Sequence, residues 1–592
     1  MKNWRSQLRV CRGVKGEKKK RIEEMSSTLV IADYVVIVMM LLVSSGIGVY
    51  YRITGGRQRT TEEYFAANRS MSVTTVAIAL MASYLSAISL LGVSSENYVY
   101  GTQYAVVNIG YGLATPVVAH LYLPVFFKLQ ATSAFEYLQL RFGSVARLAA
   151  SLAFFTQLLL YTGVVLYAPA LALEATTGLS STASILGIGL ICTFYSTLGG
   201  IKAVLVTDVF QSLLMLVAVL TIIVTAAIHA GGLDRIWDTA YDGSRVEFTS
   251  LSLDPTVRHT WWSLVIGGFF TYLSLFGANQ VQVQRMLTVK NLRSAQKAIW
   301  WSWPLASVMS LVSCFSGLAI YARYKDCDPL SSGRITSNDQ LMPLFVMDTL
   351  SRYPGIPGLF IAGIFSAGLS TVSATLNSLA VVVLEDYAKP LCKMRGSEIS
   401  SNVSTLASKI IAIVVGLLCI TMAFFAQYLG GVLQAALTIF AVVGGPVLGL
   451  FTLGMCTRYA TQRGAVTGLL IGLAFSMWIG FGQPKPSPPR LPVSTAGCNE
   501  TYVSDGATAN FERAQSTGDS TYFYLYRISY MWYCPLGFIV CILFGLLGSG
   551  LFRLIFKENN ENLHPNLYMS VGTSRQAEVL GRSDEVECKN ET

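Results

Sequence analysis

The chain has 592 residues, of which 53% are hydrophobic and only 13% are charged, and its mean hydropathy is +0.51. These values exclude an ordinary soluble globular protein and predict a polytopic membrane protein. Each membrane-spanning helix needs about 20 apolar residues, so a dozen or so spans leave no room for a large soluble catalytic domain. The formal net charge of +10 does not indicate nucleic-acid binding, because the basic residues are scattered between apolar runs.

A polar, basic segment, residues 1–28, precedes the first apolar run. Residues 1–24 contain nine Lys and Arg residues. The apolar run at 29–51 is followed by Arg52 and not by a small-residue cleavage site, so it predicts a retained first transmembrane helix and not a signal peptide. Met25 is an alternative start to Met1, and the sequence leaves both open.

The apolar runs predict an all-α polytopic membrane protein with about 13 transmembrane helices. They lie at 29–51, 73–93, 104–127, 148–173, 181–199, 207–230, 261–284, 298–322, 355–384, 408–427, 431–455, 464–481 and 530–556. The long polar gap at 482–529 predicts an extracellular loop, and residues 557–592 predict a polar cytoplasmic tail.

We expect a plasma-membrane protein, and the distribution of Lys and Arg predicts an extracellular N-terminus and a cytoplasmic C-terminus. In this orientation the short outside loops near 94–103, 174–180 and 427–431 contain no Lys or Arg, as the positive-inside rule requires. The sequon that begins at Asn499 lies in the long outside loop, where glycosylation takes place. The basic segment 1–24 opposes this orientation.

Cysteine and histidine patterns disfavour a metal site and an enzyme. None of the 11 cysteines forms a CxxC pair, and the four histidines are far apart in the sequence. We therefore expect no enzymatic activity, no nucleic-acid partner and no cofactor other than a coupling ion. Cys327 and Cys498 fall on the same outer side, and both a disulfide and two free thiols remain open.

Small and polar residues interrupt two spans at corresponding places. The second span contains Ser83, Ser86 and Ser89, and the seventh contains Gly277-Ala278-Asn279-Gln280. Weakened segments in corresponding positions of two halves are typical of transporters built from inverted repeats. Close helix packing through small residues is the alternative interpretation.

Hydroxyl side chains are dense in the ninth span, which has no charged residue between Gly358 and Leu384. The polar residues of this span are Ser366, Ser370, Thr371, Ser373, Thr375, Asn377 and Ser378. Neutral oxygens suit a weakly bound hard cation such as Na⁺, whereas proton-coupled carriers bury carboxylates. Hydroxyls that bond back to their own helix are the alternative.

One acidic residue, Asp208, stands at the inner start of the sixth span. An acidic side chain at a helix N-terminus is a common cap. The functional interpretation places Asp208 on the exit path of the cation.

Three motifs resemble hallmarks of the sodium/solute symporter family. They are Gly-Gly-Ile-Lys-Ala-Val-x-x-Thr-Asp-Val-Phe-Gln at 199–211, Gly-Ala-Asn-Gln-Val-Gln-Val-Gln-Arg at 277–285 and Leu-Ser-Thr-Val-Ser at 369–373. The resemblance runs from Ile31 to Phe556. It implies a LeuT-type inverted five-plus-five repeat, with one helix before the repeats 73–230 and 261–455 and two additional helices within 464–556.

Within the family, the chain resembles the branch that carries iodide, monocarboxylates and vitamins. Two features carry this likeness: the absence of a fourteenth span after 556 and the run Tyr-Thr-Gly-Val-Val-Leu-Tyr-Ala-Pro-Ala at 161–170. Ser89 stands where relatives carry glutamine, and Tyr272 stands where the iodide carrier has tryptophan. These departures disfavour iodide and favour a small organic acid.

The resemblance also implies site residues. A Na⁺ site would be formed by the backbone carbonyls of Ala82, Leu85 and Ala367 and the hydroxyls of Ser370 and Thr371, with Asp208 in cation coupling. The substrate cavity would be lined by Ser89, Tyr111, Tyr161, Tyr272 and Leu437.

The sequence therefore predicts a Na⁺-coupled symporter that imports a small organic anion, a monocarboxylate or vitamin-like acid, by alternating access. A transporter of a neutral solute such as a sugar or polyol, and a non-transporting solute sensor of the same fold, remain alternatives.

Overall fold

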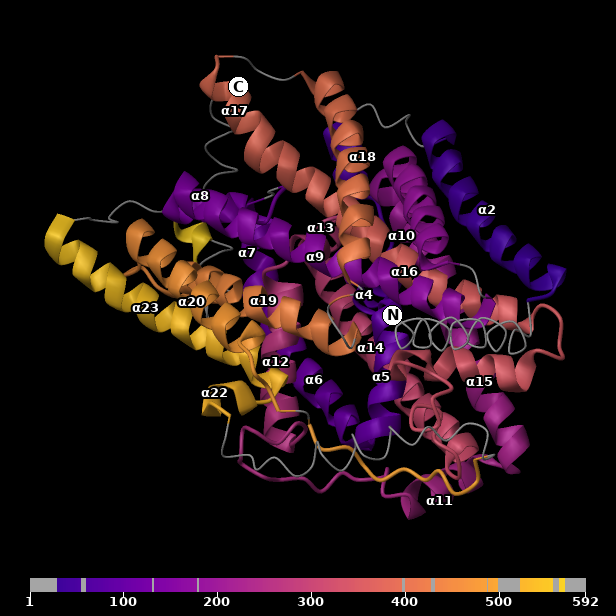
Figure 1. Ribbon diagram of the computed structural model, residues 1–592. Helices are drawn as coiled ribbons and strands as arrows, with labels where there is room; N and C mark the ends of the chain where they lie inside the picture. The colour runs from indigo at the N-terminus through magenta and orange to yellow at the C-terminus, as the bar shows by residue number, and fades with distance from the viewer. Residues whose placement is uncertain are drawn as a thin grey trace, which may run out of the picture.

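The computed structural model describes residues 29–54, 60–129, 132–177, 180–396, 400–426, 428, 432–486, 488–498, 522–556 and 564–569. Within these ranges the chain is helical between its loops and contains no β-strand. Met1, Met25 and Asn499 lie outside the described residues. The repeats and the outer loops can be followed by colour along the chain (Figure 1).

The helices of the first half follow the predicted order. They are α2 (Ile31–Thr54), α3 (Thr61–Ala66), α4 (Val73–Tyr84), α5 (Ala87–Tyr100), α6 (Val107–Val117), α7 (Leu123–Leu129), α8 (Glu136–Phe142), α9 (Ser144–Thr177), α10 (Ser181–Ala230) and α11 (Leu233–Asp242). Short 3₁₀ and π segments join several of them, at Ala67–Arg69, Thr102–Val106 and Val118–Tyr122.

The second half repeats this pattern and adds further helices. It contains α12 (Trp261–Gly277), α13 (Gln280–Met286), α14 (Leu292–Tyr324), α15 (Leu341–Leu350), α16 (Ile356–Val382), α17 (Lys389–Met394), α18 (Ser401–Ala426), α19 (Val432–Cys456), α20 (Gln462–Phe481), α22 (Tyr524–Arg527) and α23 (Tyr533–Phe556).

The number of membrane spans agrees with the prediction once one long helix is divided. Among the described residues, 10 helices are long and apolar enough to cross a membrane, and two bent pairs raise this number to 12. Helix α10 counts as one of them, but its 50 residues would reach about 75 Å, more than twice the hydrocarbon thickness. Gly200, with φ 61° and ψ −172°, breaks α10. The two halves of α10 are the predicted spans 181–199 and 207–230, so all thirteen predicted spans are helical.

Helix α16 lies at the centre of the molecule, and almost all of its residues are buried. Small residues permit this close packing: a Cβ at Gly363 would lie 2.4 Å from Cβ of Ala218 in α10. Helices α2 and α23 lie on opposite sides of the molecule (Figure 1). They expose leucines to the surroundings, among them Leu42 and Leu547, as expected of helices that face lipid.

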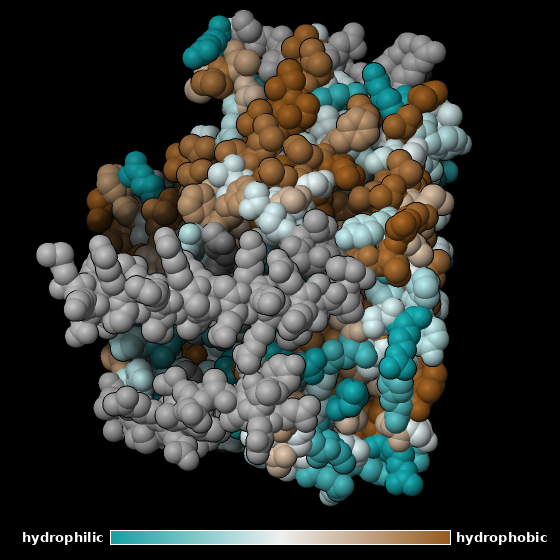
Figure 2. All heavy atoms as spheres, turned by 45° about the vertical axis from the view of Figure 1, so that its right-hand side comes forward, coloured by the Kyte–Doolittle hydropathy of each residue, from teal (hydrophilic) through white to brown (hydrophobic). Residues whose placement is uncertain are grey.

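Hydrophobic side chains predominate over the upper part of the face in Figure 2, and hydrophilic side chains gather at its lower edge. This separation matches a transmembrane region with a polar face beyond it. The loop residues around α11 lie at the lower end of Figure 1.

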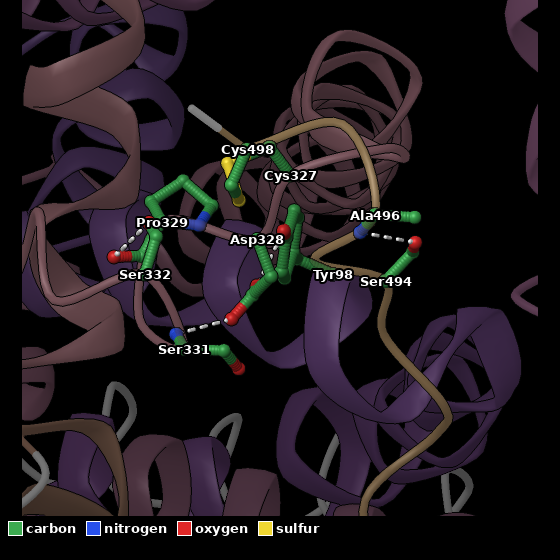
Figure 3. The surroundings of a disulfide bond; sticks show 9 residues. All are labelled: Tyr98, Cys327, Asp328, Pro329, Ser331, Ser332, Ser494, Ala496 and Cys498. Carbon is green, nitrogen blue, oxygen red and sulfur yellow. Dashed lines mark hydrogen bonds between the residues drawn. A yellow bond between two sulfur atoms is a disulfide. The ribbon is translucent and has the colours of Figure 1, made fainter. Parts of the chain in front are cut away.

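A disulfide joins two loops that are far apart in the sequence. Cys327 and Cys498 are separated by 171 residues, and their Cα atoms lie 5.0 Å apart, so the disulfide alternative is the one present (Figure 3). Beside it, Tyr98 Oη donates a hydrogen bond of 2.7 Å to Asp328 Oδ1. The disulfide therefore fastens both loops close to the outer end of α5.

Candidate functional site

Two broken helices form the core of the candidate site. Helices α4 and α5 meet at 59°, and α12 and α13 meet at 60°. At the first break Leu85 (φ −84°, ψ 97°) and Ser86 (φ −90°, ψ 173°) are extended, and at the second break Asn279 (φ −96°, ψ 126°) is extended. Extended backbone interrupts the helical hydrogen bonds and leaves polar groups for a ligand, which membrane proteins tolerate only where the backbone lines a cavity or is buried in protein.

Side chains hold the two breaks together. The Ser83 hydroxyl and the Gln282 amide lie 3.1–3.2 Å apart, so α4 contacts α13 directly. The Asn279 side chain accepts a hydrogen bond of 2.9 Å from the Val281 N–H and caps α13. The breaks in the two halves therefore face each other.

The hydroxyls of α16 meet the carbonyls of α4 at the predicted cation site. Ser370 Oγ donates to the carbonyl oxygens of Ala82 and Ala367, both at 3.1 Å. Thr371 Oγ1 donates to the Ala367 carbonyl at 3.2 Å. Leu85 is the extended residue at the end of α4. The five residues predicted to ligate Na⁺ thus lie at one junction of α4 and α16, and their role as ligands stays a prediction.

A cavity of about 70 Å³ opens beside this junction. Four of the five predicted substrate residues line it: Ser89, Tyr111, Tyr161 and Leu437. Its lining contains no Asp, Glu, Lys, Arg or His. The cavity also shares Leu85 and Thr371 with the predicted cation site, so a solute and a cation would be neighbours.

Tyr272 does not line the cavity. Its ring stacks on Tyr111 with the ring centroids 5.4 Å apart, and it is buried. Tyr111 in turn accepts a hydrogen bond of 2.7 Å from Tyr84. Tyr272 therefore packs against Tyr111 on the side away from the cavity. Its large aromatic ring fills the space between α12 and α6.

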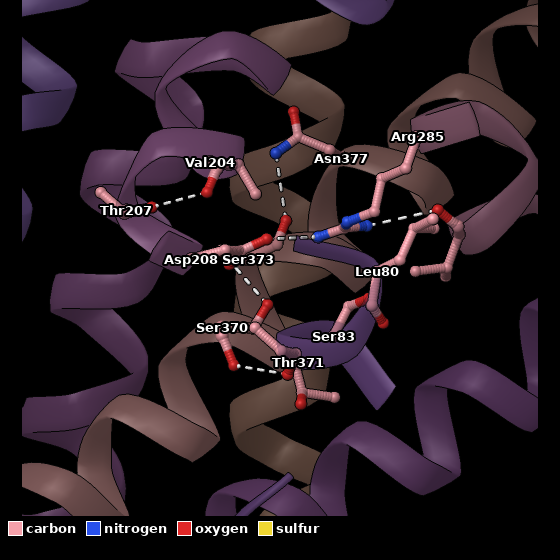
Figure 4. A network of polar contacts seen from close by, with 12 residues as sticks. Leu80, Ser83, Val204, Thr207, Asp208, Arg285, Ser370, Thr371, Ser373 and Asn377 are labelled. Atoms are coloured by element: carbon pink, nitrogen blue, oxygen red, sulfur yellow. Dashed lines mark hydrogen bonds and ion pairs between the residues drawn. The ribbon is translucent and has the colours of Figure 1, made fainter. Parts of the chain in front are cut away.

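Asp208 forms a buried ion pair that sequence reasoning did not identify (Figure 4). Arg285 Nη2 lies 3.0 Å from Asp208 Oδ2, and both side chains are fully buried. The second carboxylate oxygen, Oδ1, accepts no hydrogen bond from the described residues. The helix-cap interpretation of Asp208 is wrong, because the break at Gly200 places Asp208 about two turns inside the second half of α10.

Helix α13 supplies further contacts that the sequence analysis missed. Gln284 donates to the Phe65 carbonyl at 2.9 Å and accepts from Ser378 at 3.1 Å. Gln280 donates to the Thr132 carbonyl at 3.0 Å. The sequence could have indicated these contacts. Three glutamines and an arginine lie within six residues of one span, and buried polar groups need hydrogen-bond partners.

An ion-paired cluster lies beside the C-terminal part of α5. Arg258 Nε and Nη2 donate to the two oxygens of Glu96 at 2.6 and 3.0 Å. His259 Nε2 lies 3.2 Å from Glu96 and 3.0 Å from Tyr530 Oη. Burial lowers the pKa of His259 to about 4. The cluster joins α5 to the loop before α12 and to the segment before α23.

The comparison with known families decides the identity. A family model described as the sodium:solute symporter family matches residues 64–472. The chain belongs to this family. It is a multi-pass membrane transporter in which Na⁺ fits as the coupling ion.

Similar proteins support this assignment over most of their length. A putative sodium-dependent multivitamin transporter from Drosophila melanogaster is 53% identical over 524 residues, 88% of this chain and 86% of the relative. Sodium-coupled monocarboxylate transporter 1 from Homo sapiens is 40% identical over 538 residues, 88% of this chain and 87% of the relative.

Solved structures show the same fold. A substrate-bound, outward-open Na⁺-coupled sialic acid symporter has a TM-score of 0.73 at 24% identity, covering 88% of this chain and 98% of that chain. At this identity the likeness shows the fold alone, and it confirms the predicted helical fold with inverted repeats.

Proposed function

We propose that this chain imports a small organic anion, a monocarboxylate or vitamin-like acid, together with Na⁺ by alternating access. The observation that carries the proposal is the uncharged cavity between two broken helices, which adjoins the hydroxyls of Ser370 and Thr371. The names of the multivitamin and monocarboxylate relatives agree with such a substrate. We place the protein in the plasma membrane, with the N-terminus outside, the C-terminus inside and the repeats at 73–230 and 261–455.

The coupling cation would bind where α4 breaks against α16. The hydroxyls of Ser370 and Thr371 now donate to carbonyls, and a cation would replace these contacts with oxygen ligation. The donors are all neutral oxygens, which suits reversible binding of a hard cation. The unpartnered Oδ1 of Asp208 offers a carboxylate oxygen close to α16, in keeping with a role in cation coupling.

The carboxylate of the substrate would bind at the first turn of α5. Helix α5 begins at Ala87, and Ser86 caps it without a side-chain hydrogen bond. The Ser86 hydroxyl lines the cavity, is fully buried and has no hydrogen-bond partner among the described residues. Free N–H groups and the helix dipole favour an anion at this position. A carboxylate would accept hydrogen bonds from the Ser86 hydroxyl and from the free N–H groups. This feature favours an acid over a neutral solute.

The free energy released by Na⁺ entry is sufficient to import an anion against the membrane potential. A Na⁺ ion that enters at about −70 mV gains roughly 1.6 kcal/mol from the potential, and a tenfold gradient adds about 1.4 kcal/mol. Import of a monovalent anion costs roughly 1.6 kcal/mol against the same potential. One Na⁺ therefore supports about tenfold accumulation of the anion, and two support about a thousandfold.

The first test is uptake by oocytes that express the chain. Labelled lactate, nicotinate, biotin, iodide and glucose would be supplied in Na⁺ and then in choline while current is recorded. Na⁺-dependent uptake of an acid is expected. Uptake of glucose alone would favour the neutral-solute alternative, and no uptake or current at normal surface expression would favour a sensor.

The second test addresses the cation site. Thr371→Ala removes a predicted ligand and should raise the half-saturating Na⁺ concentration at least several-fold. Thr221→Ala is the matched control, because the Thr221 hydroxyl also bonds back one turn, to the Val217 carbonyl at 2.8 Å, and Thr221 belongs neither to the cavity lining nor to the predicted cation ligands. Equal Na⁺ dependence in both variants would refute the proposed site.

A further inference from the structure

A crevice of about 660 Å³ lies between α2, α4, α10 and α14, apart from the solute cavity. It is lined by Ile47, Thr75, Ile78, Met81, Val206, Val209, Phe210, Ser212, Leu213, Leu216, Leu305, Val308 and Met309. None of these residues is charged. The only two hydroxyls are already bonded, Thr75 to Ser72 at 2.8 Å and Ser212 to the Val209 carbonyl at 2.8 Å.

The crevice is continuous with the surface that faces the bilayer. Leu213 is 60% exposed and Val308 is 54% exposed, and both belong to membrane-spanning helices. Met81 and Met309 lie buried at the back of the crevice. Thr75 is in the first turn of α4, so in the proposed orientation the crevice lies toward the cytoplasmic leaflet.

The lining chemistry selects the occupant. An apolar space holds water poorly, and an unfilled space of this size destabilises the helices around it. The lining offers only these two hydroxyls, each already in a hydrogen bond within the protein, as partners for the hydroxyl of a sterol. Flexible, unbranched methionine side chains at the back adapt to a flexible chain. These features together favour a phospholipid acyl chain.

Two residues at the back of the crevice each precede a residue of the candidate site. Met81 is followed by Ala82, whose carbonyl accepts from Ser370. Met309 is followed by Ser310, which lines the solute cavity. A chain in the crevice would therefore pack α4 and α14 from the membrane side, next to the residues that face the ligands.

We propose that an acyl chain of a cytoplasmic-leaflet phospholipid fills this crevice and holds α4 in the position that assembles the cation site. The claim that an acyl chain binds rests only on the shape and lining of the crevice. The effect on cation binding rests on the proposed function.

The binding part is tested by photolabelling. The full chain is placed in nanodiscs of phosphatidylcholine that contains a diazirine on one acyl chain, and labelled peptides are mapped by mass spectrometry. Label should concentrate on the crevice-lining peptides of α4, α10 and α14. Val308→Trp and Leu213→Trp, which fill the crevice from two walls, should each reduce this label several-fold. Val224→Trp is the matched control, because Val224 is 55% exposed on α10 and does not line the crevice.

Two photolabelling results would overturn the proposal. One is equal label in the filling variants and in the control. The other is a photoreactive sterol that labels these peptides in preference to the acyl-chain probe, which would assign the crevice to a different lipid.

The effect on cation binding is tested in liposomes with palmitoyl-oleoyl or methyl-branched diphytanoyl chains on the same headgroup. Methyl branches widen each chain, so we expect poorer packing in the crevice and a several-fold rise in the half-saturating Na⁺ concentration of the unmodified chain in diphytanoyl lipid. Val308→Trp should remove this difference, and Val224→Trp should keep it. An unchanged Na⁺ dependence would overturn the link to the cation site. Crevice labelling without Na⁺-dependent uptake in either lipid would instead refute the proposed function and leave the lipid site standing.

Discussion

Arg285 and Asp208 pair at 3.0 Å in the interior and tie the last helix of the first repeat to the broken helix that begins the second. Arg285 Nη1 also donates to the Val281 carbonyl of its own helix at 3.2 Å. This pair therefore sets the position of α13 relative to α10. Loss of either partner should destabilise the fold, because the remaining buried charge has neither a partner nor water to stabilise it.

We expect Arg285→Gln to lower stability strongly. Breaking a buried pair costs about 3–5 kcal/mol, whereas an exposed pair contributes about 0–1 kcal/mol. The control is Arg334→Gln, which breaks the partly exposed pair with Asp348 at 2.8 Å. Thermal unfolding in detergent, followed by size-exclusion fluorescence, should show a large loss for the first variant only. Equal losses would mean that the buried pair does not hold α13.

Much of the fold followed from hydropathy, since the thirteen apolar runs became helices, with boundaries that moved by up to seven residues. The breaks at Leu85 and Asn279 lie where small and polar residues weaken the apolar pattern. The break in α10 falls at Gly200, in the predicted gap between the spans 181–199 and 207–230, but the positive φ angle of Gly200 was not predictable because it depends on neighbouring residues. The ring of Tyr64 lies 2.9 Å from the position of a Cβ there, so only glycine fits.

The site was partly predictable for a similar reason. The family resemblance pointed to the residues of α4 and α16 that meet at the predicted cation site. It did not reveal that Tyr272 lies behind Tyr111, or that Arg285 pairs with Asp208, because both relationships depend on how helices far apart in sequence pack.

Gly92 of α5 packs tightly against Leu433 of α19. A Cβ at Gly92 would lie 2.6 Å from Cβ of Leu433, and Leu433 lines both the solute cavity and a second cavity, whose lining includes Glu96 and Arg258. Gly92→Ala should displace Leu433 and slow uptake several-fold without loss of surface expression. In the control, Gly187→Ala, the new methyl meets no atom within 4 Å, so uptake should be unchanged. Normal uptake by Gly92→Ala would show that Leu433 does not control access.

The pH dependence of stability should reflect His259. Its pKa is about 4 in the folded protein, below the ordinary 6.5, because burial disfavours the charged ring. The unfolded chain therefore binds the proton more tightly, and stability that is complete above pH 6.5 is lost as the pH falls toward 4. Between pH 6.5 and pH 5 the loss is about 2 kcal/mol.

Thermal unfolding across this pH range measures the effect. His259→Gln removes the titrating group and should flatten the curve between pH 6.5 and pH 5. If the stability of this variant falls with decreasing pH as steeply as that of the unmodified chain, the pH dependence comes from other groups.

Reduction of the Cys327–Cys498 disulfide should release the outer loops from the end of α5. Beyond the disulfide, this attachment is made by the Tyr98–Asp328 hydrogen bond and by backbone hydrogen bonds, among them Asp328 N to the Ser494 carbonyl at 2.9 Å and Leu491 N to the Val99 carbonyl at 3.1 Å. A cross-link that closes a loop of 171 residues contributes at most about 5 kcal/mol by the chain-entropy model. We expect less, since the helices between the two cysteines stay ordered by the membrane.

A phosphine reductant that does not enter the cell should therefore lower the unfolding temperature of the unmodified chain and make the 488–498 segment accessible to protease from outside. The double variant Cys327→Ser with Cys498→Ser should already show both effects and not respond to the reductant. Cys456→Ser removes an exposed free thiol and should behave like the unmodified chain. If the double variant unfolds at the original temperature, the hydrogen bonds alone hold the loops, and the disulfide adds no stability to the folded transporter.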